Sequence, residues 1–562
     1  MQQIQELIMK ISFIKGNYPI NFEVKQSEYY FIKNIFMKKV FLYPLIILFF
    51  VALLFAGCMG NKVDEAETQE TGMNNFYIGW ASADITPDKP VILRGQFHAR
   101  VSEGVKDPVT ATALAIESGE GQSSEKTILI SCDLVNISDD LRDRVRELLK
   151  KSLPELLPQQ IIFNATHTHT APYVSTAKDA KELYGVELDA MAPSDYLKFV
   201  SERIATAAKQ AWNARKRGGI SYGLGHAVVG HNRLQVDFSG KSRMYGNTNR
   251  AEFSHIEGFE DHSVNLLYTW DKKSRLTGVV INVASPSQVS ESEYFISADY
   301  WHDTRVELHK RLGKDIFVLP QCSAAGDQSP HFMIGTKAEY RMQRLMMVDS
   351  IQTGRSSMGR RKQIAIDISD AVTSVLPYMK ENIDWDPLFA HQMETVQLSR
   401  RLIDMEAVNT ALQEAEDWKN KYEQILLEIK ENPEIKESPR WYKNVTISHT
   451  RMMRGHSVQK RYELEKRQPK MPVEVHVVRI GDMVMVTNPF ELYLDYGIRI
   501  KGRSPAIQTF VIQLAGSGSY IPTPRSVAGG AYGAVPASTL IGPEGGQELV
   551  EKTLEMINDV FE

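Results

Sequence analysis

Short apolar runs follow one another along the chain from Phe76 onward, and most of them end at a polar or glycine-rich cluster. Apolar runs of about four to eight residues between such clusters are typical of buried strands. We expect strands at 127–132, 161–164, 264–268, 278–283, 316–319 and 483–486, with an amphipathic helix at 139–153. This alternation predicts an α/β domain in which mixed sheets carry flanking helices.

Two further helices are expected from the spacing of apolar residues. Residues 364–376 have a helical pattern that closes at Pro377, since proline disrupts the helix that precedes it. Residues 403–431 carry Glu, Lys and Leu at helical spacing. Together with the chain up to residue 467, they predict a helical hairpin inserted into the domain.

Composition narrows the class of protein. The 562-residue chain is 43% hydrophobic and 24% charged, which is typical of a folded protein. Its net charge is −4 and it has no basic stripe, which argues against nucleic-acid binding because that needs clustered Lys and Arg. Three cysteines are too few for a disulfide framework.

An apolar run at 40–57 follows a short basic segment that begins at Met37. A basic start followed by an apolar stretch is typical of an export signal. The run ends in Leu-Phe-Ala-Gly before Cys58, which favours a lipoprotein signal peptide with Cys58 as the lipidated residue. A transmembrane anchor is the alternative, since about 18 apolar residues just suffice to span a bilayer.

This signal divides the chain into three parts. Residues 1–57 hold the signal peptide and its upstream sequence, with Met1 and Met37 as alternative start codons. Residues 58–75 form a polar tether, and 76–562 form the folded domain. We therefore expect a protein of the cell envelope that is lipid-anchored in the outer membrane, on either its periplasmic or its surface-exposed face.

Two histidines, His167 and His169, lie two positions apart directly after the apolar run 161–164. Residues two apart in an extended segment project to the same side, so both imidazoles can meet one ligand. Imidazole is a common Zn²⁺ ligand, and the neighbouring Thr hydroxyls can orient the rings. The alternative is a pair of packed or surface histidines, but in a polar loop after a strand we favour binding or catalysis.

Two other polar side chains follow apolar runs. Ser329 lies in a cluster of small residues after the run 316–319, where it is either a nucleophile, a hydrogen-bond donor or part of a turn. No Gly-x-Ser-x-Gly elbow surrounds it. Glu491 follows the run 483–486 and either ligates a metal or caps the helix after it.

Five segments, in this order along the chain, resemble the catalytic domain of the neutral ceramidase family. They are Tyr-Ile-Gly-Trp-Ala-Ser-Ala-Asp-Ile-Thr-Pro at 77–87, Ser-Cys-Asp at 131–133, Ala-Thr-His-Thr-His-Thr-Ala-Pro at 165–172, Gly-Asp-Gln-Ser-Pro at 326–330 and Ala-Ser-Thr-Leu-Ile-Gly-Pro at 537–543. The resemblance covers about residues 76–562 and implies the fold of that domain.

The resemblance also implies a set of site residues. The zinc ligands would include His167, Glu491 and Tyr520, around one Zn²⁺ ion. His169 would face the substrate as an acid or hydrogen-bond donor. Ser329 falls on the serine that these enzymes need, and Arg233 would steady a developing oxyanion.

The sequence departs from the family at two points. Ser285 stands near the position of a second zinc histidine, so the fourth ligand is open, with His302, His262 and His231 as candidates. The chain ends at Glu562, shortly after 542–543, so we expect no C-terminal immunoglobulin-like domain.

The resemblance implies an exported, zinc-dependent hydrolase that cleaves an N-acyl, ceramide-like amide with zinc-activated water. One alternative is an envelope hydrolase that acts on a glycan or another polymer. The other is a degenerate, non-catalytic binding lipoprotein, for which Ser285 is the main argument. The expected partners are a small lipid or glycan substrate and, through the anchor, the membrane. The candidates to line a sugar site are Trp80, Phe97, His98, Arg100 and Trp301, with ordinary packing as the alternative for each aromatic side chain taken singly.

Overall fold

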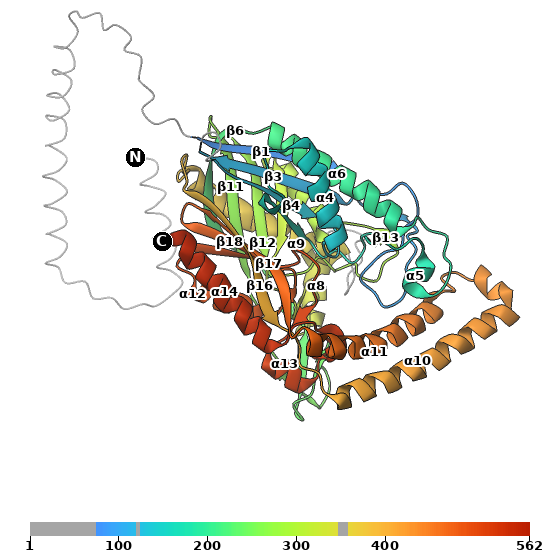
Figure 1. The fold of residues 1–562 in the computed structure, drawn as a ribbon. Helices are drawn as coiled ribbons and strands as arrows, with labels where there is room; N and C mark the ends of the chain where they lie inside the picture. Colours follow the sequence, from blue (N-terminus) through green and yellow to red (C-terminus); the bar gives the residue numbers. More distant parts are fainter. Residues whose placement is uncertain (1–74, 120–123, 347–357) are drawn as a thin grey trace, which may run out of the picture. The chain divides into compact units, whose positions relative to one another are not determined.

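The computed structural model describes residues 75–119, 124–346 and 358–562 (Figure 1). The expected signal peptide, Cys58 and nearly all of the tether lie outside these described residues. Within them, no helix is both long and apolar enough to cross a membrane.

A mixed eight-stranded sheet forms the larger half of the domain. Its outer strand pairs β4–β5 and β12–β14 are parallel, and the pairs between them are antiparallel. In sheet order the strands are β14 (Phe317–Cys322), β12 (Leu276–Val283), β11 (Ser263–Asp271), β6 (Lys216–His226), β1 (Phe76–Asp84), β3 (Thr110–Ser118), β4 (Glu125–Cys132) and β5 (Ile161–Ala165).

A four-stranded mixed sheet packs against the first one. Its strands, in order, are β16 (Phe389–Ser399), β17 (Lys470–Ile480), β18 (Met483–Thr487) and β20 (Gln508–Ile512). One apolar core joins the two sheets and contains Trp80 and Leu129 from the first, with Val478 and Phe510 from the second. The strands are thus buried on both faces, which explains their continuous apolar runs.

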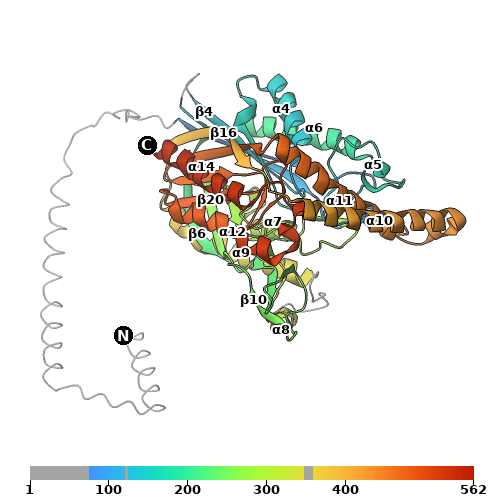
Figure 2. The same cartoon turned by 60° about the horizontal axis from the view of Figure 1, so that its bottom comes forward.

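Helices cover the outer face of each sheet (Figures 1 and 2). The large sheet carries α4 (Asp139–Ser152) and α6 (Pro193–Asn213) over one half, and α7 (Tyr300–Leu312) and α9 (Met358–Lys380) over the other. The small sheet carries α12 (Leu494–Arg503) and α14 (Pro543–Phe561). The layers therefore run helix, sheet, sheet, helix, each pair with its own apolar core.

The insertion is a helical hairpin of α10 (Met405–Glu431) and α11 (Lys443–Arg467), which extends away from the sheets (Figure 2). It is tied back to the domain near the sequence that follows β1. Thr446 Oγ1 accepts a hydrogen bond from Ala99 N at 3.1 Å, and Tyr442 OH accepts one from Val101 N at 3.2 Å. Ile429 and Val445 pack into the same small core.

Shorter elements connect these layers. They are β2 (Gly104–Val105), α5 (Ala180–Tyr184), β7 (His231–Asn232), β8 (Leu234–Asp237), β9 (Ser242–Met244), β10 (Phe253–Ile256), β13 (Phe295–Ile296), β15 (Gln328–Ser329), α8 (Thr336–Met346), β19 (Glu491–Leu492), β21 (Tyr520–Ile521) and α13 (Pro524–Gly529), with 3₁₀ turns at Pro158–Gln160, Pro433–Glu437, Tyr532–Ala534 and Pro536–Ser538.

The expected strands, the helix at 139–153 and the helical hairpin are all present in the structure. Most of their ends lie within one or two residues of the expected positions. The helix expected at 364–376 is wrong at both ends, because α9 spans Met358–Lys380 with Pro377 inside it. Proline costs a helix one hydrogen bond and a clash with the preceding turn, and α9 runs only three residues past Pro377. The sequence does not reveal the start of α9 because its first turn is basic. Arg360 and Arg361 in that turn are nevertheless buried and hydrogen-bonded.

Candidate active site

The Thr-His-Thr-His loop leaves β5 at the carboxyl edge of the large sheet. Because β4 and β5 are parallel and neighbouring, their ends bring the segments after Cys132 and Ala165 together. Thr166 N donates to Cys132 O at 3.0 Å, and His167 N donates to Leu134 O at 2.9 Å. Loops that follow neighbouring parallel strands are where α/β folds place ligands.

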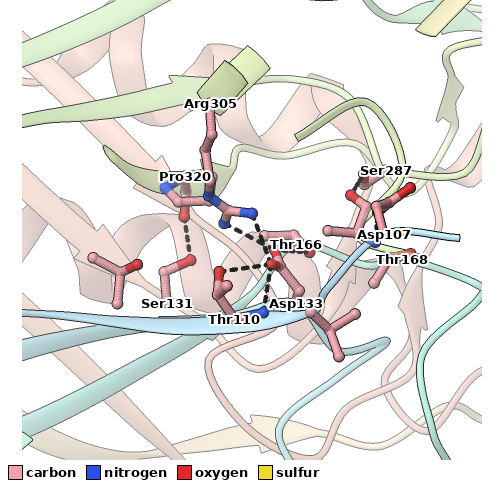
Figure 3. A network of polar contacts seen from close by, with 12 residues as sticks. Asp107, Thr110, Ser131, Asp133, Thr166, Thr168, Ser287, Arg305 and Pro320 are labelled. Carbon is pink, nitrogen blue, oxygen red and sulfur yellow. Dashed lines mark hydrogen bonds and ion pairs between the residues drawn. The ribbon is translucent and has the colours of Figure 1, made fainter. Parts of the chain in front are cut away.

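A buried carboxylate, Asp133, holds this loop from below (Figure 3). Arg305 on α7 donates to both of its oxygens, at 2.8 and 3.0 Å. Thr110 donates to it through N–H and hydroxyl at 2.9 Å each, and Thr166 Oγ1 donates at 3.3 Å. The charge is paired and its hydrogen bonds are filled, so the loop has a rigid base.

A second buried network holds the other end of the loop. Thr168 Oγ1 and Thr170 Oγ1 both donate to Ser297 O, at 2.7 and 2.9 Å. Ser297 donates its hydroxyl to Asp107, whose carboxylate also accepts a 2.8 Å bond from Arg361. The threonines between the histidines therefore act as anchors of the loop.

His167 has a strained backbone with φ of 64°, a left-handed conformation that is costly outside glycine. Its Nδ1 lies 2.7 Å from Val135 O, and a carbonyl only accepts, so Nδ1 carries the proton. Nε2 is left with its lone pair. Burial lowers the pKa of His167, although Glu491 opposes the shift, so the ring is held neutral and able to ligate.

His169 faces the same point, as the spacing predicted. Its Nε2 lies 3.1 Å from Nε2 of His167, and since the latter has no proton, His169 donates. Its Nδ1 lies 3.9 Å from Glu291 Oε2 and makes no hydrogen bond among the described residues. Burial and the nearby His167 place the pKa of His169 well below its usual value.

Glu491 and Tyr520 are brought together by the backbone. β19 and β21 form a two-stranded parallel ribbon in which Glu491 pairs with Tyr520. Glu491 Oε2 lies 3.5 Å from His167 Nε2. Burial, reinforced by the charge of Glu491, raises the pKa of Tyr520 well above its usual value. Glu491 does not cap the next helix, which begins at Leu494 without a side-chain cap.

Arg233 lies beside Tyr520, and Tyr245 connects it to Ser329. Arg233 donates to Tyr245 OH at 2.9 Å, to Gly326 O at 2.8 Å and to Tyr520 OH at 3.4 Å. Burial disfavours its charge, but Tyr245, Tyr520 and Glu491 outweigh burial and raise the pKa of Arg233 further. The guanidinium is therefore a permanent cation beside the phenol oxygens.

Ser329 is fully buried, with Oγ 3.4 Å from Tyr245 OH, and it accepts a bond from His331 N at 3.2 Å. Among the described residues, no histidine ring nitrogen is hydrogen-bonded to this hydroxyl. A serine nucleophile needs such a base, so the geometry fits a hydrogen-bonding serine.

Sequence reasoning gave no role to several residues that line the site. Tyr245, itself at φ 65°, links Arg233 to Ser329 and receives a hydrogen bond from Gln288. Glu291 lies 3.4 Å from His331 Nε2 as well as near His169. Tyr245 follows Arg233 and Glu291 follows Ser285 within about a dozen residues, but neither stands in a segment with a recognisable pattern.

The three candidates for a fourth zinc ligand lie elsewhere. His231 and His262 flank Glu260 at 3.3 and 3.4 Å. The backbone of His302 bonds to Asp299 O at the start of α7. Ser285 donates its hydroxyl to Pro286 O at 3.3 Å.

In the part of the chain that the structure describes, no group of three or more His, Cys, Asp and Glu side chains is arranged to hold a metal ion. The side chains that converge after β5 and on β19 and β21 are His167, Glu491 and Tyr520. Among them Glu491 is the one carboxylate, and the phenol of Tyr520 is the other oxygen group that could bind a metal. A site of this kind depends on tyrosine as well as on the usual ligand types.

The residues expected to line a sugar site do not form one surface. Trp80 stacks on Phe317 inside the core between the sheets, and Trp301, on α7, is 1% exposed in the core beneath that helix. Arg100 is fully buried and donates to backbone carbonyls, including that of His169. For Trp80 and Trp301 the alternative of ordinary packing therefore holds.

The fold is that of the neutral ceramidases. The crystal structure of neutral ceramidase from Pseudomonas aeruginosa is similar with a TM-score of 0.60 and 14% sequence identity, over 86% of this chain and 74% of that one. A structure described as ceramidase complexed with C2 is similar with a TM-score of 0.58, 14% identity and the same coverage. The sequence itself matches no family model and no curated protein.

Proposed function

We propose that this protein is a ceramidase-like hydrolase that cleaves an N-acyl amide bond with a zinc-bound water. The observation that carries the proposal is the approach of Glu491, paired with Tyr520, to the unprotonated Nε2 of His167. These three side chains reach the same point from three separate segments of the chain. Burying them is costly unless they hold something.

The three side chains suit a catalytic zinc site. Such sites use about three protein ligands from N and O donors and keep one position open for water. His167 would supply a neutral nitrogen, Glu491 a carboxylate and Tyr520 a phenol oxygen beside the Arg233 cation. When bound, zinc would supply a water of lowered pKa and polarise the scissile carbonyl.

The remaining residues bind and orient the substrate. Arg233 and the Ser329 hydroxyl, which Tyr245 links, would act as donors for negative charge that develops on the carbonyl oxygen. His169 is neutral in its buried setting, so it would take up the proton that the attacking water loses and pass it on to the leaving nitrogen, returning to the neutral form. Glu291, behind Nδ1, would stabilise the ring while it exchanges protons.

Release of sphingosine from N-acetylsphingosine by the full-length protein, purified with zinc, tests this function. The wild type should hydrolyse the amide, and Glu491→Gln should lose at least about 100-fold in kcat, as expected when a metal ligand loses its charge. Glu260→Gln is the matched control, because its carboxylate lies between His231 and His262. A Glu491→Gln protein as active as the control would contradict the proposal.

A further inference from the structure

A pocket of about 270 Å³ lies beside the candidate site, between residues 94–97 and the inserted helix α11. Two of its lining residues also contact the site. Gly95, at φ 109°, packs so closely on His169 that a Cβ would lie 2.5 Å from the ring. The ring of Tyr532 lies 5.9 Å from that of Tyr520. The pocket therefore adjoins the candidate site through Gly95 and Tyr532.

Three arginines surround the pocket. Arg94 lines it and lies 4.7 Å above the Tyr173 ring. Arg451 and Arg454, one turn apart on α11, both approach the Phe97 ring, at 4.9 and 5.8 Å. Two of the three positive charges thus come from the inserted hairpin.

These guanidiniums are positioned without being neutralised. Arg454 lies 4.8 Å from the Tyr532 ring and donates to Ala537 O at 3.0 Å, and Arg451 also lies 5.1 Å from Trp418. Within the described ranges, Arg94, Arg451 and Arg454 form no ion pair with a carboxylate. Aromatic faces and carbonyls hold an arginine in place but leave its charge available.

We propose that this pocket binds an anionic group, a phosphate, sulfonate or carboxylate, carried on the amine half of the amide substrate. Guanidinium forks match the geometry of such oxyanions, and aromatic walls suit the chain that links the anion to the amide. The inference rests on the proposed function and names its substrate class: an anionic N-acyl lipid. The hairpin is then the element that selects the headgroup.

Binding of sphingosine 1-phosphate and sphingosine to the full-length protein, measured by titration calorimetry, tests the inference. Neither probe has an amide, so binding is measured without turnover. The phosphorylated probe should bind at least about tenfold more tightly, the scale of one charge-assisted hydrogen bond. The double variant Arg94→Gln/Arg451→Gln should abolish that preference. Lys460→Gln, an exposed charge on the same helix, should preserve it.

Arg451→Gln alone serves as a second variant, because Arg451 is exposed and its loss should leave folding intact. This substitution should weaken the binding of sphingosine 1-phosphate and leave the binding of sphingosine unchanged. Equal affinity for both probes, or no change in the arginine variants, would overturn the inference. So would inorganic phosphate competing as strongly as the lipid phosphate, since the pocket would then take a free anion. If amide hydrolysis fails but the preference holds, the proposed function falls and the anion pocket remains.

Discussion

Nε2 of His169 lies 3.1 Å from Nε2 of His167, and the proton between them belongs to His169. This follows because Nδ1 of His167 already donates to the Val135 carbonyl. The two histidines of one motif therefore have different roles: one presents a lone pair and the other a proton.

That division predicts how His169→Ala should behave. The variant should still bind the proposed zinc ion, because His167, Glu491 and Tyr520 remain, but kcat should fall by about 10²- to 10⁴-fold with the loss of a proton donor. Metal analysis and steady-state kinetics on the same preparation measure both. Loss of the metal together with activity would make His169 a ligand instead.

The buried pair of Asp133 and Arg305 should stabilise the motif loop strongly. Asp133→Asn leaves Arg305 without its charge partner, so we expect a loss of about 3–5 kcal/mol in the free energy of unfolding. Denaturant unfolding measures this. Adding Arg305→Gln should recover part of the loss, and strictly additive effects would show that the two do not interact.

A histidine chain in the small sheet predicts a pH effect on stability. His391 Nε2 lies 3.0 Å from His476 Nδ1, and burial with the His476 charge lowers the pKa of His391 to about 3. Between about pH 6.5 and pH 3, His391 binds a proton in the unfolded state but not in the folded state. The free energy of unfolding should therefore decrease as the pH is lowered, by at most about 1.4 kcal/mol per pH unit for this group. Well above about pH 6.5, His391 is neutral in both states and adds no pH dependence to the free energy of unfolding.

Unfolding free energies of His391→Gln across that range should therefore show a shallower slope than the wild type. His255→Gln, at an exposed position, is the control and should keep the wild-type slope. An unchanged slope in His391→Gln would rule out His391 as a source of the pH dependence.

We propose that Cys58, which lies outside the described residues, is lipidated. Radiolabelled fatty acid should enter the wild type and not Cys58→Ala, and only the wild type should pellet with membranes. The other cysteines will not interfere, since Cys132 and Cys322 are buried and burial raises the pKa of the Cys322 thiol to about 12. Equal labelling of Cys58→Ala would exclude the anchor.

Much of the fold was predictable because the strands are buried on both faces and read as continuous apolar runs. The packing of two sheets against each other was not, since periodicity says nothing about which sheet covers which face. The site residues carried by motifs, such as His167 and Glu491, do converge. Tyr245 and Glu291 could not be found, because they reach the site through loops whose sequences have no distinctive pattern.

The central claim is that one bound metal and amide hydrolysis depend on the same side chain, His167. We would measure zinc content and N-acetylsphingosine hydrolysis for the wild type, His167→Ala and the control His231→Ala, all purified without chelator. We expect about one zinc per chain and turnover in the wild type and control, with both lost in His167→Ala. A metal-loaded His167→Ala protein with wild-type turnover would contradict the account.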